Sequence, residues 1–246
     1  MDLTQQWQAP SSPLVAGSMQ VRVEYRLGGA HLEIDAVDCD HVPFEHAEPV
    51  RSFPSWRLKR HYDGHHWMRS LGVSIGFESL TERACLIELD RTSDVTAVAS
   101  QPMWIHWDAP DGKRNHCPDY FVRLDGGRVV LIDVKPAAQI DSDVRQQFDM
   151  TASFAADRGW SYVVYNGESP ARQANLRFLN VFGGRGAAGD VPSLPHEGLP
   201  LAEVAALLGS GSDGYARCYA HLWSGQYEAD LDLPLSTRTV LRERSA

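Results

Sequence analysis

Two short segments near the amino end alternate apolar with polar residues. Residues 19–27 and 32–37 show this period of two on either side of Gly28 and Gly29, and glycines supply the positive φ angles that a tight turn requires. The pattern predicts a half-exposed β-hairpin, which we expect either to add an edge to the main sheet or to form a docking surface. Residues 1–17 show little periodicity and are predicted to form a loosely ordered arm.

A second and more apolar hairpin is predicted over residues 117–136. Two runs rich in valine, isoleucine, phenylalanine and tyrosine flank the turn residues 125–127, an aspartate followed by two glycines. The second run is apolar from 129 to 132, which predicts a strand covered on both faces. It ends at Asp133 and Lys135. Charged side chains at the end of a buried strand must be paired, hydrogen-bonded or bound to a metal ion.

The length of the turn decides whether Asp119 joins this pair. With a three-residue loop, Leu124 pairs with Arg128, and counting back sets Asp119 directly opposite Asp133. Lys135 then lies on the same face, because side chains alternate along a strand. Opposed residues have Cβ atoms roughly 4.5–5.5 Å apart, so two carboxylates could bind one divalent cation beside an ammonium group. A two-residue loop would place Asp119 on the other face.

The segments between the two hairpins predict a helix and two strands. Residues 79–90 favour a helix that begins with Ser79 and Glu82 in the S-x-x-E pattern of a capping box. Residues 95–100 and 103–107 are predicted strands. A polar turn region, 108–115, is expected to lead into the central hairpin.

Beyond the central hairpin, a strand–helix–strand succession is predicted. Residues 143–157 carry a helical apolar stripe that Gly159 ends, and residues 160–165 read as a strand. This order favours a right-handed crossover and a mixed sheet. Gln146 and Gln147 lie on the helix and could line a cleft, although exposed glutamines are common.

The carboxy-terminal part is predicted to form a separate small unit. Residues 182–195 are rich in glycine, alanine and proline and suit a linker. Residues 200–208 predict a short helix, and 221–235 a strand-like run whose acidic residues favour a protein contact; a plain cap on the core is the alternative. The predicted organisation is an arm and hairpin (1–50), a core (51–180), a linker (181–195) and a small unit (196–246).

Composition limits the class of protein. The chain has 246 residues, 43% of them hydrophobic, which suffices for a sizeable core. No apolar run approaches the roughly 18 residues of a membrane span, and the amino end lacks a signal pattern, so a soluble cytoplasmic protein without a membrane segment is expected. The four cysteines are widely separated, which favours reduced thiols. No group of histidines and cysteines, His106, His116 and Cys117 included, has a complete zinc spacing, and we interpret these as ordinary loop residues.

The net charge of the chain indicates that any contact with nucleic acid is confined to a local patch. The net charge is −9, the wrong sign for a protein that binds DNA over its whole surface. The best local candidate is the basic and aromatic stretch 51–70, since basic side chains neutralise phosphates and aromatic rings can stack on bases. A solvated loop over packed aromatic side chains is the alternative. The candidate DNA-binding residues are Arg57, Lys59, Arg60, His61 and Arg69.

The central motif resembles a known nuclease signature. Pro118-Asp119, followed by Asp133-Val134-Lys135, resembles the PD-(D/E)xK motif of restriction-endonuclease-like nucleases. Together with the flanking segments 77–83, 100–102 and 134–138, this motif makes the chain similar to TnsA-type transposon endonucleases, particularly the compact TnsA-like proteins of actinobacterial type. The likeness runs from about residue 51 to about residue 179. It implies a restriction-endonuclease-like α/β fold, a mixed sheet flanked by helices, here with an N-terminal β-hairpin extension and a small C-terminal unit.

The resemblance also implies roles for individual residues. Asp119, Asp133 and Glu82 would bind Mg²⁺, with Mn²⁺ as a substitute, and the carbonyl of Val134 would be a further ligand. Lys135 would orient or activate the attacking water, or meet the developing charge. Glu82 could instead serve only its own helix cap; the downstream motif favours the metal site.

Three functions remain open from the sequence. The first is a Mg²⁺-dependent endonuclease that cuts the 5′ strands at transposon ends, beside a TnsB-like transposase and a TnsC-like ATPase. The second is a nuclease of the same fold in phage defence or repair. The third is an inactive DNA- or protein-binding module derived from such a nuclease. The sequence also leaves open whether the chain forms a homo-oligomer.

Overall fold

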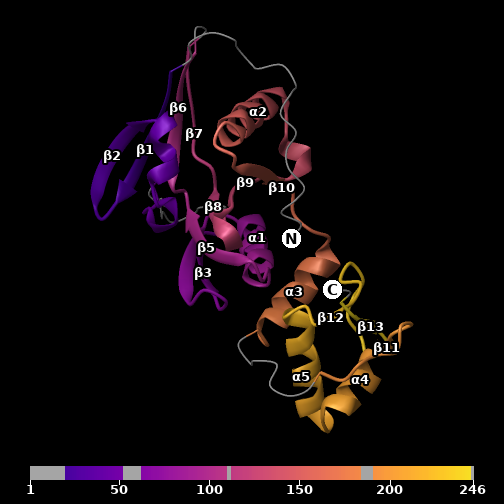
Figure 1. Ribbon diagram of the computed structural model, residues 1–246. Helices are drawn as coiled ribbons and strands as arrows, with labels where there is room; N and C mark the ends of the chain where they lie inside the picture. Colours follow the sequence, from indigo (N-terminus) through magenta and orange to yellow (C-terminus); the bar gives the residue numbers. More distant parts are fainter. Residues whose placement is uncertain (1–19, 52–61, 110–111, 184–190, 245–246) are drawn as a thin grey trace. The chain divides into compact units, whose positions relative to one another are not determined.

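The computed structural model describes residues 20–51, 62–109, 112–183 and 191–244 (Figure 1). These residues divide into two compact units, and each has its own apolar core. The first unit comprises the described residues of Met1–Trp67, Val73–Leu86 and Asp94–Gly167, and the second those of Met68–Gly72, Ile87–Ser93 and Glu168–Ala246.

An antiparallel sheet with the strand order β2-β1-β6-β7 forms one part of the first unit. The predicted amino-terminal hairpin is present as β1 (Gln20–Leu27) and β2 (Ala30–Asp35), and β1 also pairs with β6 (Met103–Ala109). The polar turn expected at 108–115 is wrong, because β7 (Gly112–His116) pairs with β6 as an edge strand. Its polar sequence carries no strand signal of its own; the pairing supplies it.

A mixed sheet with the order β10-β9-β8-β5 carries the central hairpin. Its strands are β5 (Val95–Ser100), β8 (Tyr120–Leu124), β9 (Val129–Val134) and β10 (Ser161–Tyr165). β9 runs parallel to β10, whereas β8 is antiparallel to both β5 and β9. The expected mixed sheet is therefore confirmed.

The turn between β8 and β9 has the predicted length. It is the three-residue turn Asp125–Gly127, in which Gly126 has φ +73° and Gly127 φ +78°. These left-handed angles favour glycine. The N–H of Leu124 donates to the carbonyl of Arg128 at 2.8 Å, so the hairpin has the register in which Asp119 faces Asp133.

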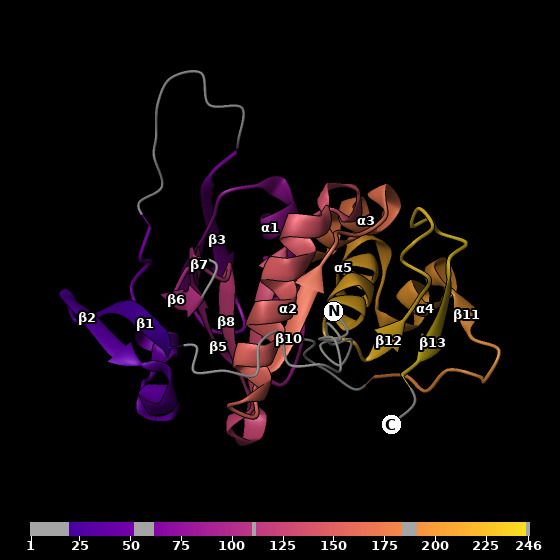
Figure 2. The ribbon, with the colours of Figure 1, turned by 90° about the horizontal axis from the view of Figure 1, so that it is seen from above.

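Helices cover the mixed sheet. Helix α2 (Ser142–Ala156) lies along β10 and packs Phe148 and Phe154 into the core of the first unit (Figure 2). Side chains alternate across β8, so Phe121 points into this core while Tyr120 faces Glu82 and Cys85 of α1 (Leu80–Asp90). Both helices lie within two residues of the predicted bounds. A two-stranded sheet of β3 (Gly64–Met68) and β4 (Val73–Phe77) precedes α1.

Short 3₁₀ turns complete the first unit. They span Ala36–His41, Phe44–His46 and Ala137–Gln139. The second of them inserts Phe44, which is fully buried, against Tyr25 and Phe121. An aromatic cluster of this kind joins the two four-stranded sheets of the unit through side-chain packing.

The second unit is built on helices. α3 (Pro170–Asn180), α4 (Leu201–Leu208) and α5 (Gly211–Trp223) enclose its core, and a small sheet joins β11 (Leu199–Pro200), β13 (Val240–Glu243) and β12 (Tyr227–Glu228). The prediction of a strand-like run at 221–235 is wrong for residues 221–223, which are the last residues of α5. Within the rest of the run, β12 is a short strand. A Cβ at Gly214 would lie 2.1 Å from the carbonyl oxygen of Ala205, so this glycine permits close packing of α5 on α4.

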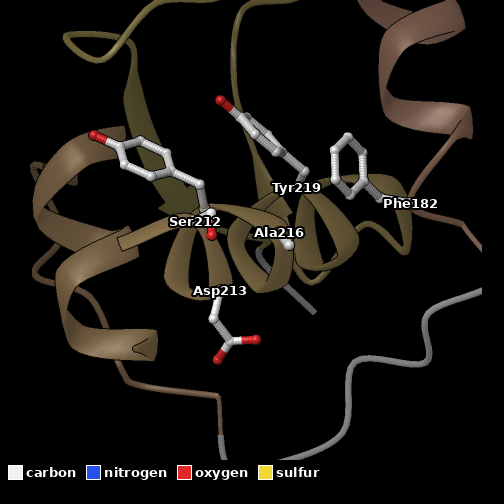
Figure 3. A pocket seen from close by; sticks show the side chains of 6 residues that line it. Phe182, Ser212, Asp213, Ala216 and Tyr219 are labelled. Carbon is white, nitrogen blue, oxygen red and sulfur yellow. The ribbon is translucent and has the colours of Figure 1, made fainter. Parts of the chain in front are cut away.

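An aromatic hollow of about 520 Å³ lies in the second unit (Figure 3). Phe182 and Tyr219 have ring centroids 5.0 Å apart, and Tyr215 lies one helical turn before Tyr219. Asp213 lines the hollow and pairs with Arg217 at 3.1 Å.

Among the described residues, none of the helices combines the length and the apolar character needed to cross a membrane.

Candidate active site

Asp119 and Asp133 meet at the end of the mixed sheet. Tyr120 pairs with Ile132, so the residues one step further along the register, Asp119 and Asp133, are opposite each other. Oδ2 of Asp119 accepts a hydrogen bond from the N–H of Val134 at 2.7 Å. This bond fixes the Asp119 carboxylate across the end of β9, as the predicted register requires.

Two donors hold the Asp133 carboxylate, and both bind the same oxygen. Oδ2 lies 2.7 Å from Nε2 of His116 and accepts a short hydrogen bond from the hydroxyl of Tyr162. Asp133 is only 3% exposed, and a buried carboxylate requires such partners. Oδ1 of Asp133 accepts no hydrogen bond from any residue in the described parts of the chain.

His116 is itself oriented by helix α2. The side-chain amide nitrogen of Gln147 lies 2.5 Å from Nδ1 of His116. Because an amide nitrogen donates, Nδ1 accepts, and with this amide orientation the proton of a neutral imidazole is on Nε2, facing Asp133. The chain Gln147–His116–Asp133 therefore connects α2, β7 and β9.

Electrostatic repulsion is concentrated at Asp119. Burial, followed by the charges of Asp133 and Glu82, raises the pKa of Asp119 well above its usual value. The hydrogen bond from Val134 and the charge of Arg51 act in the opposite direction but do not offset this increase. A divalent cation between the carboxylates would remove the repulsion, and carboxylate oxygens are the hard ligands that Mg²⁺ prefers. The donor chemistry of Asp119 and Asp133 thus fits such an ion.

Glu82 forms the predicted capping box. Its Oε1 accepts from the Ser79 hydroxyl at 2.8 Å and its Oε2 from the N–H of Glu78 at 2.7 Å, while its own N–H donates to Ser79 Oγ at 3.1 Å. Burial raises the pKa of Glu82. Both carboxylate oxygens are engaged in the cap, but the charge of Glu82 still acts on Asp119.

Lys135 follows directly on β9. Its N–H donates to the carbonyl of Tyr165 at 2.9 Å, and its side chain is half-buried. The Lys135 side chain has no hydrogen bond or ion pair within the described ranges. A second cation, Arg51, pairs with Glu78 at 2.5 Å and contributes positive charge at Asp119.

Gln101 supports the backbone of Asp119 from an unusual conformation. It is 2% exposed and has φ +47°, the left-handed region that side chains other than glycine rarely adopt. Its N–H donates to the carbonyl of Asp119 at 2.8 Å, and its own carbonyl accepts from Val50 at 2.9 Å. This strained residue thus ties the turn between β5 and β6 to the candidate site.

The structure brings only part of the predicted set together. Asp119, Asp133 and the charge of Glu82 converge, but no three histidine, cysteine, aspartate or glutamate side chains among the described residues are arranged to hold a metal ion. Val134 was predicted to offer its carbonyl to the metal; the group of Val134 that contacts Asp119 is the N–H. Arg69 is exposed in the turn after β3. The other four predicted DNA-binding residues, Arg57, Lys59, Arg60 and His61, lie outside the described residues.

Sequence reasoning missed His116 and Tyr162 and gave Gln147 no specific role. His116 was interpreted as an ordinary loop residue, but it lies on β7 and binds Asp133. Tyr162 reaches Asp133 from β10, where Val164 pairs with Asp133, so Tyr162 lies two residues away on the same face. The register of two parallel strands leaves no mark in the sequence. The sequence did indicate that such residues exist, because the buried charge of Asp133 requires a hydrogen-bond donor.

A mixed sheet that ends in opposed carboxylates, with a lysine beside them and helices on its faces, is consistent with an α/β nuclease-like fold. Residues 92–167 match the family model described as TnsA-like endonuclease N terminal. This region holds β5 to β10 and, within them, Asp119, Asp133 and Lys135. Over these residues the chain is similar to the N-terminal domain of TnsA-like endonucleases. No curated protein matches the chain.

Proposed function

We propose that the chain is a metal-dependent DNA endonuclease, and that it is the subunit that cuts the 5′ strands in a heteromeric transposase of TnsA type. The observation that carries the proposal is the pairing of Asp119 with Asp133 in a mutually repulsive arrangement that a cation would relieve. The family match over residues 92–167 supports the nuclease class.

Each residue of the site has a proposed role. Asp119 and Asp133 would hold Mg²⁺ or Mn²⁺ through the oxygens that accept no hydrogen bond from the described residues, with the carbonyl of Val134 and waters as further ligands. Glu82 would contribute its charge, and ligation if its cap opens. The bound ion would supply charge stabilisation and a nucleophilic water at neutral pH. Lys135 would orient that water or meet charge on the phosphate.

The assembly is proposed from the resemblance. The partners would be DNA, a TnsB-like transposase and a TnsC-like ATPase, and the protein would act in the cytoplasm, where the DNA is. The acidic residues of the run 221–235, Glu228, Asp230 and Asp232, suit a protein contact better than a DNA contact. A nuclease of the same fold in defence or repair would use the same site.

Metal binding tests the site without its partners. Calorimetry with Mn²⁺ should show binding to the wild type that Asp119→Ala and Asp133→Ala both abolish, because each removes one ligand of a shared ion. Lys135→Ala should keep metal binding and lose DNA cleavage, measured with partner proteins present. A wild type that binds no Mn²⁺ at millimolar concentration would identify an inactive, nuclease-derived module.

A further inference from the structure

A hydrogen-bond relay runs from helix α2 to the Asp133 carboxylate. The side-chain amide of Gln147 contacts Nδ1 of His116, and Nε2 of His116 lies 2.7 Å from Oδ2 of Asp133. Gln147 is on α2, His116 on β7 and Asp133 on β9. Because Asp133 is a proposed metal ligand, His116 and Gln147 lie beside the metal site without being ligands themselves.

A backbone carbonyl fixes the direction of this Gln147–His116–Asp133 relay. The amide nitrogen of Gln147 also lies 3.4 Å from the carbonyl oxygen of Asn115. A carbonyl oxygen only accepts, so the group of Gln147 that faces Asn115 and His116 is the NH₂ group and not the amide oxygen. Nδ1 of His116 must then accept, which leaves the proton of the neutral imidazole on Nε2, where it donates to Asp133.

The relay also decides which oxygen of Asp133 is left for a cation. His116 and the hydroxyl of Tyr162 both bind Oδ2, whereas Oδ1 accepts no hydrogen bond from the described residues. The side chains of His116 and Asp133 are only 12% and 4% exposed, so water competes little for their hydrogen bond. A carboxylate held in this way at one oxygen keeps a fixed orientation, and such hydrogen-bonded partners orient metal ligands.

We propose that His116 and Gln147 are positioning residues for metal binding: the relay holds Oδ2 of Asp133 and thereby presents Oδ1 to the cation. Gln147 acts only through His116, because its amide selects the imidazole tautomer that can donate. Without that amide the imidazole can adopt the other tautomer, whose unprotonated Nε2 would repel the Asp133 oxygen. The inference rests on the proposed function, since it concerns the same metal site.

Calorimetry with Mn²⁺ on the full chain tests the role of His116. His116→Leu should weaken Mn²⁺ binding by about 10–100-fold, the usual effect of losing a partner that orients a metal ligand. His116→Gln should bind within about threefold of the wild type, because its amide nitrogen can donate in place of Nε2. This rescue separates positioning from packing, since leucine and glutamine both approach histidine in size.

Gln147→Met keeps the length of the side chain and removes the donor, so we expect about tenfold weaker Mn²⁺ binding. The matched control is Gln146→Met, one residue earlier on α2, where the glutamine contacts Arg114 instead. This control should bind within about twofold of the wild type. In the His116→Leu background, Gln147→Met should change the affinity by less than about twofold, because no imidazole is left to orient. An equal effect of Gln147→Met in both backgrounds would overturn the proposal.

The tautomer of His116 can be measured without any metal. Nitrogen NMR on metal-free protein that carries isotope-labelled histidine should show His116 protonated on Nε2 alone. Gln147→Met should reduce the share of this tautomer. A wild-type His116 that is protonated on Nδ1 would overturn the relay.

The two proposals can fail separately. A wild type that binds Mn²⁺, together with unchanged binding in His116→Leu and Gln147→Met, would overturn the positioning role and leave the nuclease proposal intact. A wild type that binds no Mn²⁺ would instead overturn the nuclease proposal and the positioning role with it.

Discussion

At the scale of single residues, the candidate site is a source of instability. Burial and two neighbouring carboxylates raise the pKa of Asp119. Gln101, which donates a hydrogen bond to the carbonyl of Asp119, has a left-handed backbone conformation. Both features disfavour the folded state, and such costs concentrate where a protein binds or reacts. The fold retains them through the hydrogen bonds that hold Asp119 and Asp133 in place.

Replacing Asp119 should therefore stabilise the metal-free protein. Asp119→Asn keeps an acceptor for the Val134 N–H and removes the repulsion, so we expect the unfolding free energy of the first unit to rise by about 0.5–2 kcal/mol at neutral pH. A raised folded-state pKa gives stability that is lost as pH rises through that pKa. The gain should accordingly be small near pH 4 and grow toward pH 8, in thermal unfolding with EDTA.

The control for this substitution is Asp125→Asn. Asp125 is an exposed aspartate in the turn of the same hairpin, so its replacement should leave the melting temperature within about a degree. Equal shifts for the two variants, or a destabilised Asp119→Asn, would contradict the repulsion inferred at the site.

At the scale of elements, the sequence predicted local structure well and non-local pairing poorly. The three-residue turn at 125–127 fixed the register of the hairpin, because glycine and aspartate specify turns locally. The capping box of α1 was also predicted from its local sequence. Strand β7 was missed, since its polar residues become a strand only by pairing with β6. Tyr162 was missed because parallel pairing of β9 and β10 depends on a crossover, not on a turn.

Helix α1 offers a way to separate the two roles of Glu82. Glutamine also completes a capping box, so Glu82→Gln should leave the unfolding free energy within about 0.5 kcal/mol. It should weaken Mn²⁺ binding, because it removes a charge that acts on Asp119. Ser79→Ala should do the reverse, with a loss of about 1 kcal/mol from the cap and retained metal binding.

Urea unfolding and calorimetry on the same protein samples measure both effects. If Glu82→Gln binds Mn²⁺ as tightly as the wild type, Glu82 is a helix cap and has no part in the metal site.

At the scale of the whole molecule, two cores imply two unfolding transitions. The core of the second unit includes Leu176 and Leu179 of α3 with Val204 of α4. Near it, Glu88 is fully buried and its carboxylate pairs with Arg172 at 2.8 Å. Burial alone would raise the pKa of Glu88, but the charges of Arg172 and Arg91 contribute to a net pKa below the usual value.

Removing Arg172 should affect one transition selectively. Arg172→Met removes the nearer cation and leaves the buried Glu88 carboxylate with Arg91 at 3.8 Å. We expect the transition of the second unit alone to shift in calorimetric scans, by less than the roughly 3–5 kcal/mol that a fully broken buried pair costs. A lowered pKa gives stability that is present above the unfolded value of about 4.3 and lost as pH falls through the folded value. Wild-type protein should thus lose the contribution of Glu88 to the stability of this unit below about pH 4.

The double variant Glu88→Gln/Arg172→Met is the control, and it should recover part of the loss, because it removes the buried carboxylate while Arg91 keeps its hydrogen bond to the carbonyl of Leu222 at 3.2 Å. A shift of both transitions by the same amount in Arg172→Met would show that the two cores unfold as one cooperative block.

The attachment of both donors to a single oxygen of Asp133 has a consequence for ion selectivity. With Oδ2 bound to His116 and Tyr162, this carboxylate can offer a cation one oxygen and not two. Calcium takes six to eight oxygen ligands, often from bidentate carboxylates, whereas magnesium takes six at shorter, near-octahedral positions. The Tyr162 hydroxyl and the His116 imidazole would therefore favour magnesium over calcium, because calcium would lack ligands at this site.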